Sequence, residues 1–213
     1  MPQHEQAQPR PDVDWSMSED QPAALANLTR VLSCIGPTCG DSIDWGAAEQ
    51  VYGTSFPADY RAFIAAFGSG GIEDVVGVFT PAVSSAESQI SKVSRLSETA
   101  LVAEEVNNWA PADQGRYRLE DLLIWGGTAA ADTLCWITTD PDPDQWPVAV
   151  YTRFDLEWTV YPCGMAEFLL KLLRNQWHPY PISDTSLQHD THPRFLHDND
   201  EAAAYEAGRY PWE

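Results

Sequence analysis

The residues best placed for chemistry are three aspartates, Asp140, Asp142 and Asp144, which alternate with prolines just before Trp146. Alternating carboxylates can begin a calcium-binding loop, but that loop needs a glycine at its sixth position and a glutamate at its twelfth. This chain has glutamine and tyrosine there. We therefore predict a solvated turn between two strands and no metal site. The three carboxylates and the adjacent indole form a candidate partner-binding edge.

The histidines and cysteines do not form a recognisable metal or redox motif. His189, His192 and His197 lie among aspartates in a polar segment with no nearby cysteine, and zinc sites need ligands held by folded structure. We predict a flexible segment there. Cys34 and Cys39 match neither a redox motif nor half of a zinc site. All four cysteines are therefore predicted to be ordinary reduced thiols.

No residue pattern typical of catalysis stands out in the chain. The glycines of Gly68 to Gly71 follow a helical segment, whereas a phosphate-binding loop precedes its helix. Of the five histidines, one is His4 and the other four lie at residue 178 or later. Residues 5–177 therefore contain no imidazole for acid–base catalysis. The sequence predicts no catalytic residue and no cofactor, so we expect a protein that is not an enzyme. A hydrolase that uses carboxylates is kept as the third alternative.

Charge is the most unusual global property. The chain has 12 Lys and Arg against 32 Asp and Glu, a net charge of −20, and residues 18–178 alone hold 22 acids and 9 bases. Such a field repels the phosphates of nucleic acids and speeds association with a basic protein. The alternative is that the acidity serves only solubility.

The chain is long enough to bury one substantial core, so we expect a single domain. Residues 1–17 are predicted to be an N-terminal extension, residues 18–178 the domain, and residues 179–213 an acidic, proline-containing tail. We read no secretion signal and no apolar run long enough to span a membrane, so we expect a cytoplasmic protein.

Hydrophobic spacing divides the domain into helices and strands. The predicted fold class is α+β, with a mostly antiparallel sheet of about four to six strands and helices packed against it. Residues 82–109 are predicted to be mostly helical. Trp109 and Trp146 are expected to be partly exposed. The other predicted helices cover about 20–34, 44–52, 57–67 and 165–176, and the predicted strands cover 72–79, 122–126, 133–138, 148–153 and 157–161.

Several motifs occur in a characteristic order between residues 44 and 174. They are Phe56-Pro-x-Asp-Tyr-x-x-Phe-Ile-x-x-Phe-Gly-x-Gly-Gly71, Trp125-Gly126, Asp132-Thr-Leu-Cys-Trp136, Asp140-Pro-Asp-Pro-Asp-Gln-Trp-Pro-Val148 and a closing helix with Phe168-Leu169. This order resembles the SUKH superfamily, also called the yeast cell-wall synthesis regulator family. The resemblance implies a SUKH-like fold built from these core and turn residues.

The resemblance also implies a function, because the bacterial members of that family are largely immunity proteins. We expect a protein that binds and neutralises a polymorphic toxin domain by stoichiometric protein–protein binding. The expected partner is a basic protein toxin, possibly a nuclease domain, and neither a nucleic acid nor a membrane. The alternative is a regulatory or scaffolding protein that binds endogenous partners, as the eukaryotic relatives do.

Overall fold

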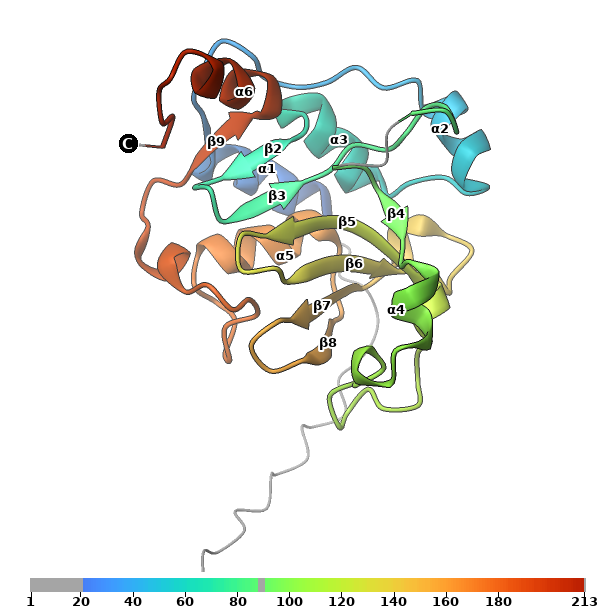
Figure 1. Ribbon diagram of the computed structural model, residues 1–213. Coiled ribbons are helices and arrows are strands. Elements are labelled where there is room, and N and C mark those ends of the chain that lie inside the picture. The colour runs from blue at the N-terminus through green and yellow to red at the C-terminus, as the bar shows by residue number, and fades with distance from the viewer. Residues whose placement is uncertain (1–20, 88–90, 213) are drawn as a thin grey trace, which may run out of the picture.

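The computed structural model describes residues 21–87 and 91–212 and shows an α+β fold built on one nine-stranded sheet (Figure 1). The strand order is β1-β9-β2-β3-β5-β6-β7-β8, and β4 pairs beside β5. All pairings are antiparallel except β1 with β9, which confirms the predicted fold class with more strands than expected. The strands are β1 (Ser33–Cys34), β2 (Gly70–Ile72), β3 (Val76–Val78), β4 (Ser94–Arg95), β5 (Leu122–Thr128), β6 (Thr133–Ile137), β7 (Val148–Thr152), β8 (Glu157–Tyr161) and β9 (Arg194–His197).

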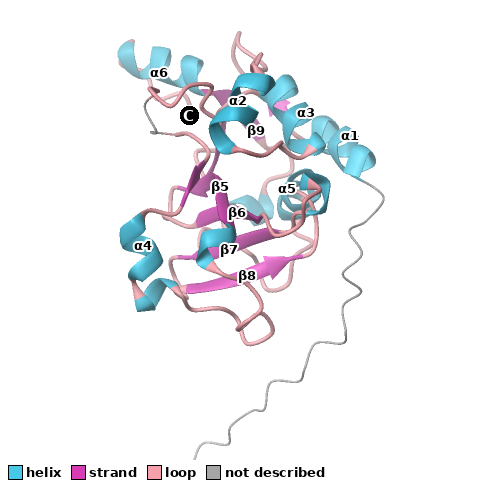
Figure 2. Cartoon of the chain, turned by 90° about the vertical axis from the view of Figure 1, so that its right-hand side faces the viewer, coloured by secondary structure: helices cyan, strands magenta, loops and turns pink. Residues whose placement is uncertain are grey.

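Helices lie on both faces of this sheet (Figure 2). Three of them cover one face, here called the inner face: α1 (Gln21–Val31), α3 (Ala58–Phe67) and α5 (Met165–Leu173). On the opposite, outer face lie α4 (Glu98–Val102) and α6 (Asp198–Glu206), at opposite ends of the sheet. The remaining helices are α2 (Trp45–Tyr52) and the 3-10 turns η1 (Glu104–Val106), η2 (Leu119–Asp121), η3 (Pro143–Gln145) and η4 (Ser186–His189).

The predicted helix signals act as expected in α2 and α3. The carboxylate of Asp44 accepts a hydrogen bond from the Ala47 N–H (3.0 Å) and so caps α2, which ends at Gly53 with φ 68°. The α3 helix begins directly after Pro57, whose missing N–H costs nothing in the first turn. The apolar residues of α3 lie on one face and are buried. Local sequence therefore sets both helices.

The core divides into two clusters. The larger cluster fills the space between the inner face and the helices, where Trp125 of β5 packs against Trp136 of β6 and against Phe168 of α5. The smaller cluster lies on the outer face over β5 to β8, where Trp158 stacks on Trp109. The second cluster covers only this half of the outer face.

The segment predicted as one strand over residues 72–79 forms a hairpin instead. Ile72 and Val76 pair across β2 and β3, and the turn between them has Glu73 at φ 50° and Asp74 at φ 56°. Two successive residues at positive φ give the tight turn that suits a two-stranded hairpin. The prediction of a single strand was wrong because these two positions are occupied by acids and not by the glycine or asparagine that usually marks such a turn.

The prediction of mostly helical structure for residues 82–109 was also wrong. The described part of this region contains β4, the single-turn α4 and η1, joined by turns. Val93 is fully buried, whereas Val102 in α4 is 80% exposed. The apolar residues do not share one helical face, so each short piece packs separately against β5 or the outer cluster.

The predicted C-terminal tail forms part of the domain. β9 pairs with β2 on one side and β1 on the other, and Phe195 is fully buried. The expectation of a flexible tail after residue 179 was therefore wrong. Four residues are too few for a clear apolar alternation, and their pairing partners lie more than 100 residues away in sequence. The predicted extension, residues 1–17, lies outside the described residues.

Two of the four cysteines form a disulfide, which corrects the prediction of reduced thiols. Cys34 at the end of β1 is bonded to Cys39, five residues later. Cys135 and Cys163 are buried free thiols, as predicted, and burial raises the pKa of each. Within the described ranges, no helix combines the length and the apolar composition needed to cross a membrane.

Candidate functional site

The acidic turn between β6 and β7 is held by its own carboxylates. Asp140 accepts a hydrogen bond from the Asp142 N–H (2.9 Å), and Asp142 accepts one from the Asp144 N–H (3.0 Å). Asp144 accepts one from the Ala58 N–H (2.6 Å) at the start of α3. Asp140 and Asp142 are exposed and Asp144 is half-buried. The turn is therefore solvated, as predicted, but its third carboxylate caps a helix.

Trp146 cannot be an exposed anchor beside this turn. Its side chain is 2% exposed, its ring faces Trp136, and its Nε1 donates a hydrogen bond to the carbonyl of Asp140 (2.7 Å). Trp109 is also buried. The expected exposure of both indoles was wrong, because the turn folds the Trp146 ring back into the core. Of the four candidate contact residues, only Asp140 and Asp142 are exposed.

Three other carboxylates are buried, those of Asp59, Asp113 and Asp132, and all serve the fold. Asp113 accepts a hydrogen bond from the Val160 N–H (3.2 Å). Asp59 accepts hydrogen bonds from the N–H groups of Tyr60 (2.7 Å) and Ala166 (2.9 Å), which ties α3 to the start of α5. Burial raises the pKa of Asp59 and these two bonds partly offset the rise. Asp132 accepts from the N–H groups of Arg153 and Ser183 (each 2.8 Å). None of the three carboxylates lines a described pocket.

The histidines do not assemble a metal site. His197 lies in β9, its Nε2 is 3.2 Å from Asp41 Oδ1, and its Nδ1 accepts from the Asn199 N–H (3.1 Å) at the start of α6. Across residues 21–87 and 91–212, no group of three His, Cys, Asp or Glu side chains is arranged to hold a metal ion. His197 instead joins β9 and α6 to the loop before α2.

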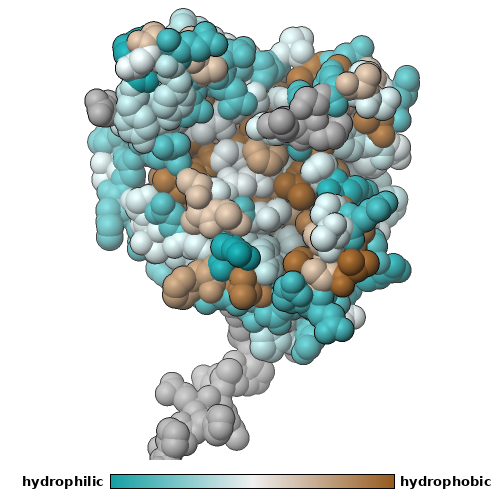
Figure 3. All heavy atoms as spheres, in the orientation of Figure 1, coloured by the Kyte–Doolittle hydropathy of each residue, from teal (hydrophilic) through white to brown (hydrophobic). Residues whose placement is uncertain are grey.

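A bare patch lies on the outer face where β2, β3 and β5 meet. Gly71 pairs with Gly77, and Gly77 pairs with Gly127, so three glycines form a row across three strands. The flanking Ile72, Val76 and Val78 point to the inner core, which places the glycines on the outer face. Figure 3 looks onto this face, where the centre is pale and hollowed between coloured side chains.

This glycine row is the floor of a cavity of about 280 Å³, here called the hollow. A Cβ added at Gly71 would lie 3.2 Å from the Trp212 ring, which covers that end of the floor. A Cβ at Gly77 would lie 3.6 Å from the Phe79 ring, at ordinary contact distance. Aromatic rings therefore border the floor on two sides, and a Cβ at Gly127 would lie 3.2 Å from the Asp132 carbonyl oxygen. The open space lies above Gly77.

The hollow has an acidic rim formed by Asp74 of the hairpin turn and by Asp198 and Glu201 of α6. Asp74 accepts a hydrogen bond from the Tyr210 hydroxyl and Glu201 accepts one from Trp212 Nε1, each 2.8 Å. Both donors are neutral, so these hydrogen bonds do not neutralise the negative charge of the two carboxylates. Such a rim attracts cations.

Two basic residues beside the lining of the hollow are engaged by other groups. Arg194 forms two side-chain hydrogen bonds to Glu73, at 2.9 and 2.8 Å. Lys92, which follows the lining residue Ser91, lies 3.1 Å from Thr80 Oγ1 and 3.7 Å from a Glu87 oxygen. Neither cation forms an ion pair with a rim carboxylate in the described part of the chain.

Sequence reasoning missed the hollow for an identifiable reason. Gly71 was taken as part of a helix end, and the alternation of Val76, Gly77 and Val78 was taken only as strand propensity. An apolar–glycine–apolar strand is the available signal, because it leaves one face without side chains. The rim residues of α6 could not be found, since their segment was expected to be a tail.

Protein-family models, curated proteins and solved structures were all compared with this chain, and none matches it. The resemblance to the SUKH superfamily stays a prediction from the sequence motifs.

Proposed function

We propose that this protein is an immunity protein that binds a basic, nuclease-like toxin domain and blocks it by stoichiometric protein–protein binding. The observation that carries the proposal is the acidic excess. With 32 acids and 12 bases, pairing every base with one acid would still leave 20 acids without a cation. Six of the bases already lie in ion pairs with acids of the fold.

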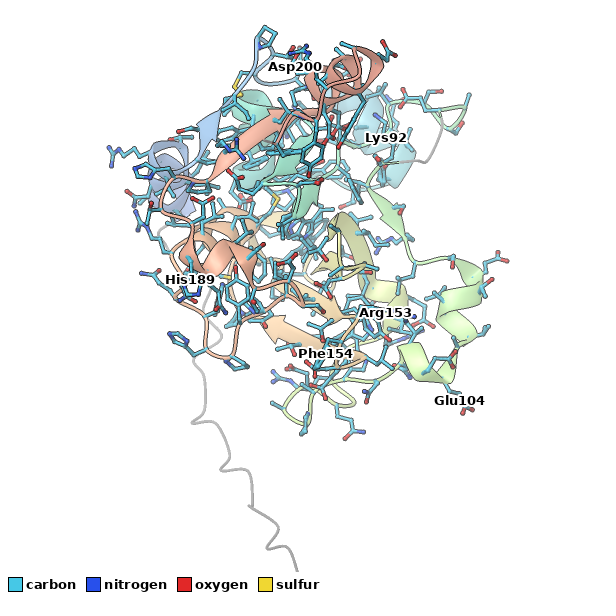
Figure 4. The ribbon with its side chains drawn as sticks, turned by 60° about the vertical axis from the view of Figure 1, so that its left-hand side comes forward. Lys92, Glu104, Arg153, Phe154, His189 and Asp200 are labelled. Carbon is cyan, nitrogen blue, oxygen red and sulfur yellow. A yellow bond between two sulfur atoms is a disulfide. The ribbon has the colours of Figure 1, made fainter. Side chains whose placement is uncertain are left out.

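The negative net charge explains attraction of a basic partner, but it does not specify which surface the partner contacts. Figure 4 labels Glu104 near one end of the molecule and Asp200 near the other, so acidic side chains are spread over the surface. A distributed field steers a basic partner toward the protein and raises the association rate, while close contacts set the dissociation rate. The proposed mechanism is therefore electrostatic capture followed by docking at a shaped surface.

A binding function also agrees with the side chains found in the described regions. The buried carboxylates of Asp59 and Asp132 are engaged by backbone N–H groups, and His197 is engaged by Asp41 and Asn199. These groups hold the fold together and face no described cavity that a substrate could enter. We accordingly propose a protein that acts by binding and not by catalysis.

The decisive experiment looks for a toxin gene beside the gene of this protein and then expresses the two together. Co-expression should restore growth, and the two purified proteins should form a 1:1 complex whose association rate falls steeply as salt rises. Loss of both protection and complex formation would reject the immunity function. Protection with a salt-independent association rate would reject the electrostatic mechanism and leave solubility to account for the acidity.

The acidic turn is tested separately with Asp140→Lys and Asp142→Lys together. Asp144 is left unchanged because it caps α3. If the turn contacts the toxin, the double variant should bind it at least about tenfold more weakly, since two attractive charges become repulsive. Wild-type binding would exclude the turn as a contact surface and would not affect the immunity proposal.

We place the proposed activity in the cytoplasm, where the toxin would meet its target. Disulfides are rare in cytosolic proteins, so the state of Cys34 and Cys39 is informative. Cells lysed directly into denaturant with excess alkylating reagent should give protein with four modified cysteines if the compartment is reducing, because unfolding exposes the buried Cys135 and Cys163. Two modified cysteines would show that the Cys34–Cys39 bond persists and would argue for an oxidising compartment.

A further inference from the structure

We infer that the hollow binds an arginine side chain presented by the basic partner. This inference rests on the proposed function and adds the chemical group that the site selects. A guanidinium group matches the hollow in three ways. Its flat face suits the glycine floor, its π system suits the bordering rings, and its positive charge suits the acidic rim.

The floor suits a flat group because it consists of peptide planes without side chains. Gly77 and Gly127 are neighbours in paired strands, and their backbone groups take part in the sheet ladder. The floor therefore offers a surface for stacking rather than hydrogen bonds. The ring of Phe79 lies beside both glycines, within 3.8 Å of where their Cβ atoms would be. Guanidinium groups stack on such surfaces more readily than ammonium groups.

The rim supplies the acceptors that the floor lacks. Asp198 has no hydrogen-bond partner for its side chain among the described residues, and it begins α6 beside the floor. Glu201 and Asp74 each use one oxygen for an aromatic side chain, Trp212 or Tyr210, and keep a second oxygen. A guanidinium group carries five N–H donors in a rigid fork, which matches several carboxylate oxygens better than the single ammonium of lysine does.

Electrostatic repulsion disfavours two alternative occupants of the hollow, residues 1–20 and a second copy of the chain. Residues 1–20 contain five acids and one base, so their approach to three further carboxylates is repelled. A second copy of the chain brings a net charge of −20 to the same rim. A basic partner is the occupant with complementary charge.

The test uses N-acetyl-arginine amide as the probe and backbone amide NMR spectra of the full chain as the readout. We expect saturable shifts of the Gly71, Gly77 and Gly127 amides, with a dissociation constant on the order of 1–10 mM for so small a ligand. N-acetyl-lysine amide should bind at least about threefold more weakly, because it cannot stack as a plane.

Gly77→Leu is the blocking variant, since its Cβ meets only ordinary contacts and its side chain fills the hollow. Gly46→Leu, on the exposed face of α2, is the matched control because its Cβ also meets only one ordinary contact. Arginine binding should fall at least about tenfold in the first variant and stay unchanged in the second. Asp198→Asn, which keeps the shape of the side chain, should weaken binding and provides a second test if Gly77→Leu misfolds.

Three results would overturn the inference: no saturable shift of the floor glycines, wild-type arginine binding by both Gly77→Leu and Asp198→Asn, or equal binding of the lysine and arginine probes. These outcomes do not depend on a toxin. They are therefore separate from failure of the immunity function, which would appear as lost protection while the arginine probe still binds. Removal of residues 1–20 should leave probe affinity unchanged; a marked rise would identify that segment as the occupant instead.

Discussion

The two halves of the sheet are built in different ways. Strands β5 to β8 follow one another along the chain as antiparallel hairpins, and side chains cover both of their faces except at the Gly127 end of β5. The other half joins the β2–β3 hairpin to β9, which lies more than 100 residues later in sequence. Its inner face is packed, but its outer face carries the glycine row.

This difference suggests a division of roles, in which the β5–β8 half stabilises the fold and the β9–β2–β3 half offers a surface for recognition. The β5–β8 half devotes both faces to core packing, so little of it is available to a partner. The β9–β2–β3 half shares the inner core but leaves its outer face open, and α6 brings acids to its border. The packed half thus holds the open half in place. The following predictions test whether the two halves unfold together.

The largest effect is expected from Leu169→Asp in α5. Leu169 is fully buried beneath the sheet, so the variant would place an unpaired carboxylate in the main core. The loss should exceed about 4 kcal/mol, a large part of the total stability of an ordinary domain, and the protein should be unfolded or insoluble. Val102→Asp, at a side chain that is 80% exposed, is the control and should remain soluble with an unchanged thermal midpoint.

Phe195→Ala tests the half completed by β9. The Phe195 ring is fully buried and packs against Phe63 (5.9 Å between centroids) and Phe67 (5.4 Å) of α3. Its removal should cost about 3–5 kcal/mol. Because both halves contribute to one inner cluster, urea unfolding should remain a single transition. Two separate transitions would show that the halves are independent, and Tyr210→Ala at the exposed C-terminal segment should have little effect.

Glu73→Gln probes the link between the hairpin and β9 through pH. Burial raises the pKa of Glu73, but hydrogen bonds and charge from Arg194 outweigh that effect and leave the pKa below its ordinary value of 4.5. A lowered pKa in the folded state contributes stability above pH 4.5 and loses it as pH falls through the folded value. Wild type should exceed the variant by about 1–2 kcal/mol at pH 7, and the gap should close toward pH 3.

Glu49→Gln is the matched control for that titration. Glu49 also faces an arginine, Arg61, but the pair is 3.5 Å apart and about 40% exposed on both sides. Such a surface pair adds little to stability. Equal pH profiles for the two variants would mean that the Glu73–Arg194 pair contributes no more than a surface pair does.

The smallest effect is expected from Asp144→Ala. The Asp144 carboxylate caps the first turn of α3, so its loss should cost about 1 kcal/mol in chemical denaturation. Asp155→Ala, in the exposed β7–β8 turn, should cost less because the Asp155 carboxylate contacts Thr152 only at 3.5 Å. An unchanged midpoint for Asp144→Ala would free all three aspartates of the acidic turn for partner contact.

The sequence was informative where the signals are local. Asp44 and Gly53 marked the ends of α2, and the apolar repeat of residues 165–173 marked α5, because caps and helical spacing act within a few residues. β9 lacks such a signal, since its stability comes from pairing with β1 and β2. Propensity cannot reveal a contact with a distant strand.

The candidate site was harder to predict than the fold. The acidic turn was found from composition, yet burial of Trp146 removed its proposed anchor. The hollow depends on Gly71, Gly77 and Gly127 falling into one row, which requires the strand register, and on α6 lying beside them. Register and layer packing are properties of the assembled sheet, so no single segment carries them.

The position of β9 also determines when the sheet can close during protein synthesis. β2 leaves the ribosome long before residues 194–197, so one edge of the β2–β3 hairpin has no neighbour while the intervening residues are made. Unpaired strand edges invite pairing with other chains. Gly70 and Gly71 make this edge a poor template, because glycine is disfavoured in strands and gives a partner strand no side chain to pack against. We expect Gly71, which also leaves the outer face open, to reduce aggregation of the nascent chain until its last strand arrives.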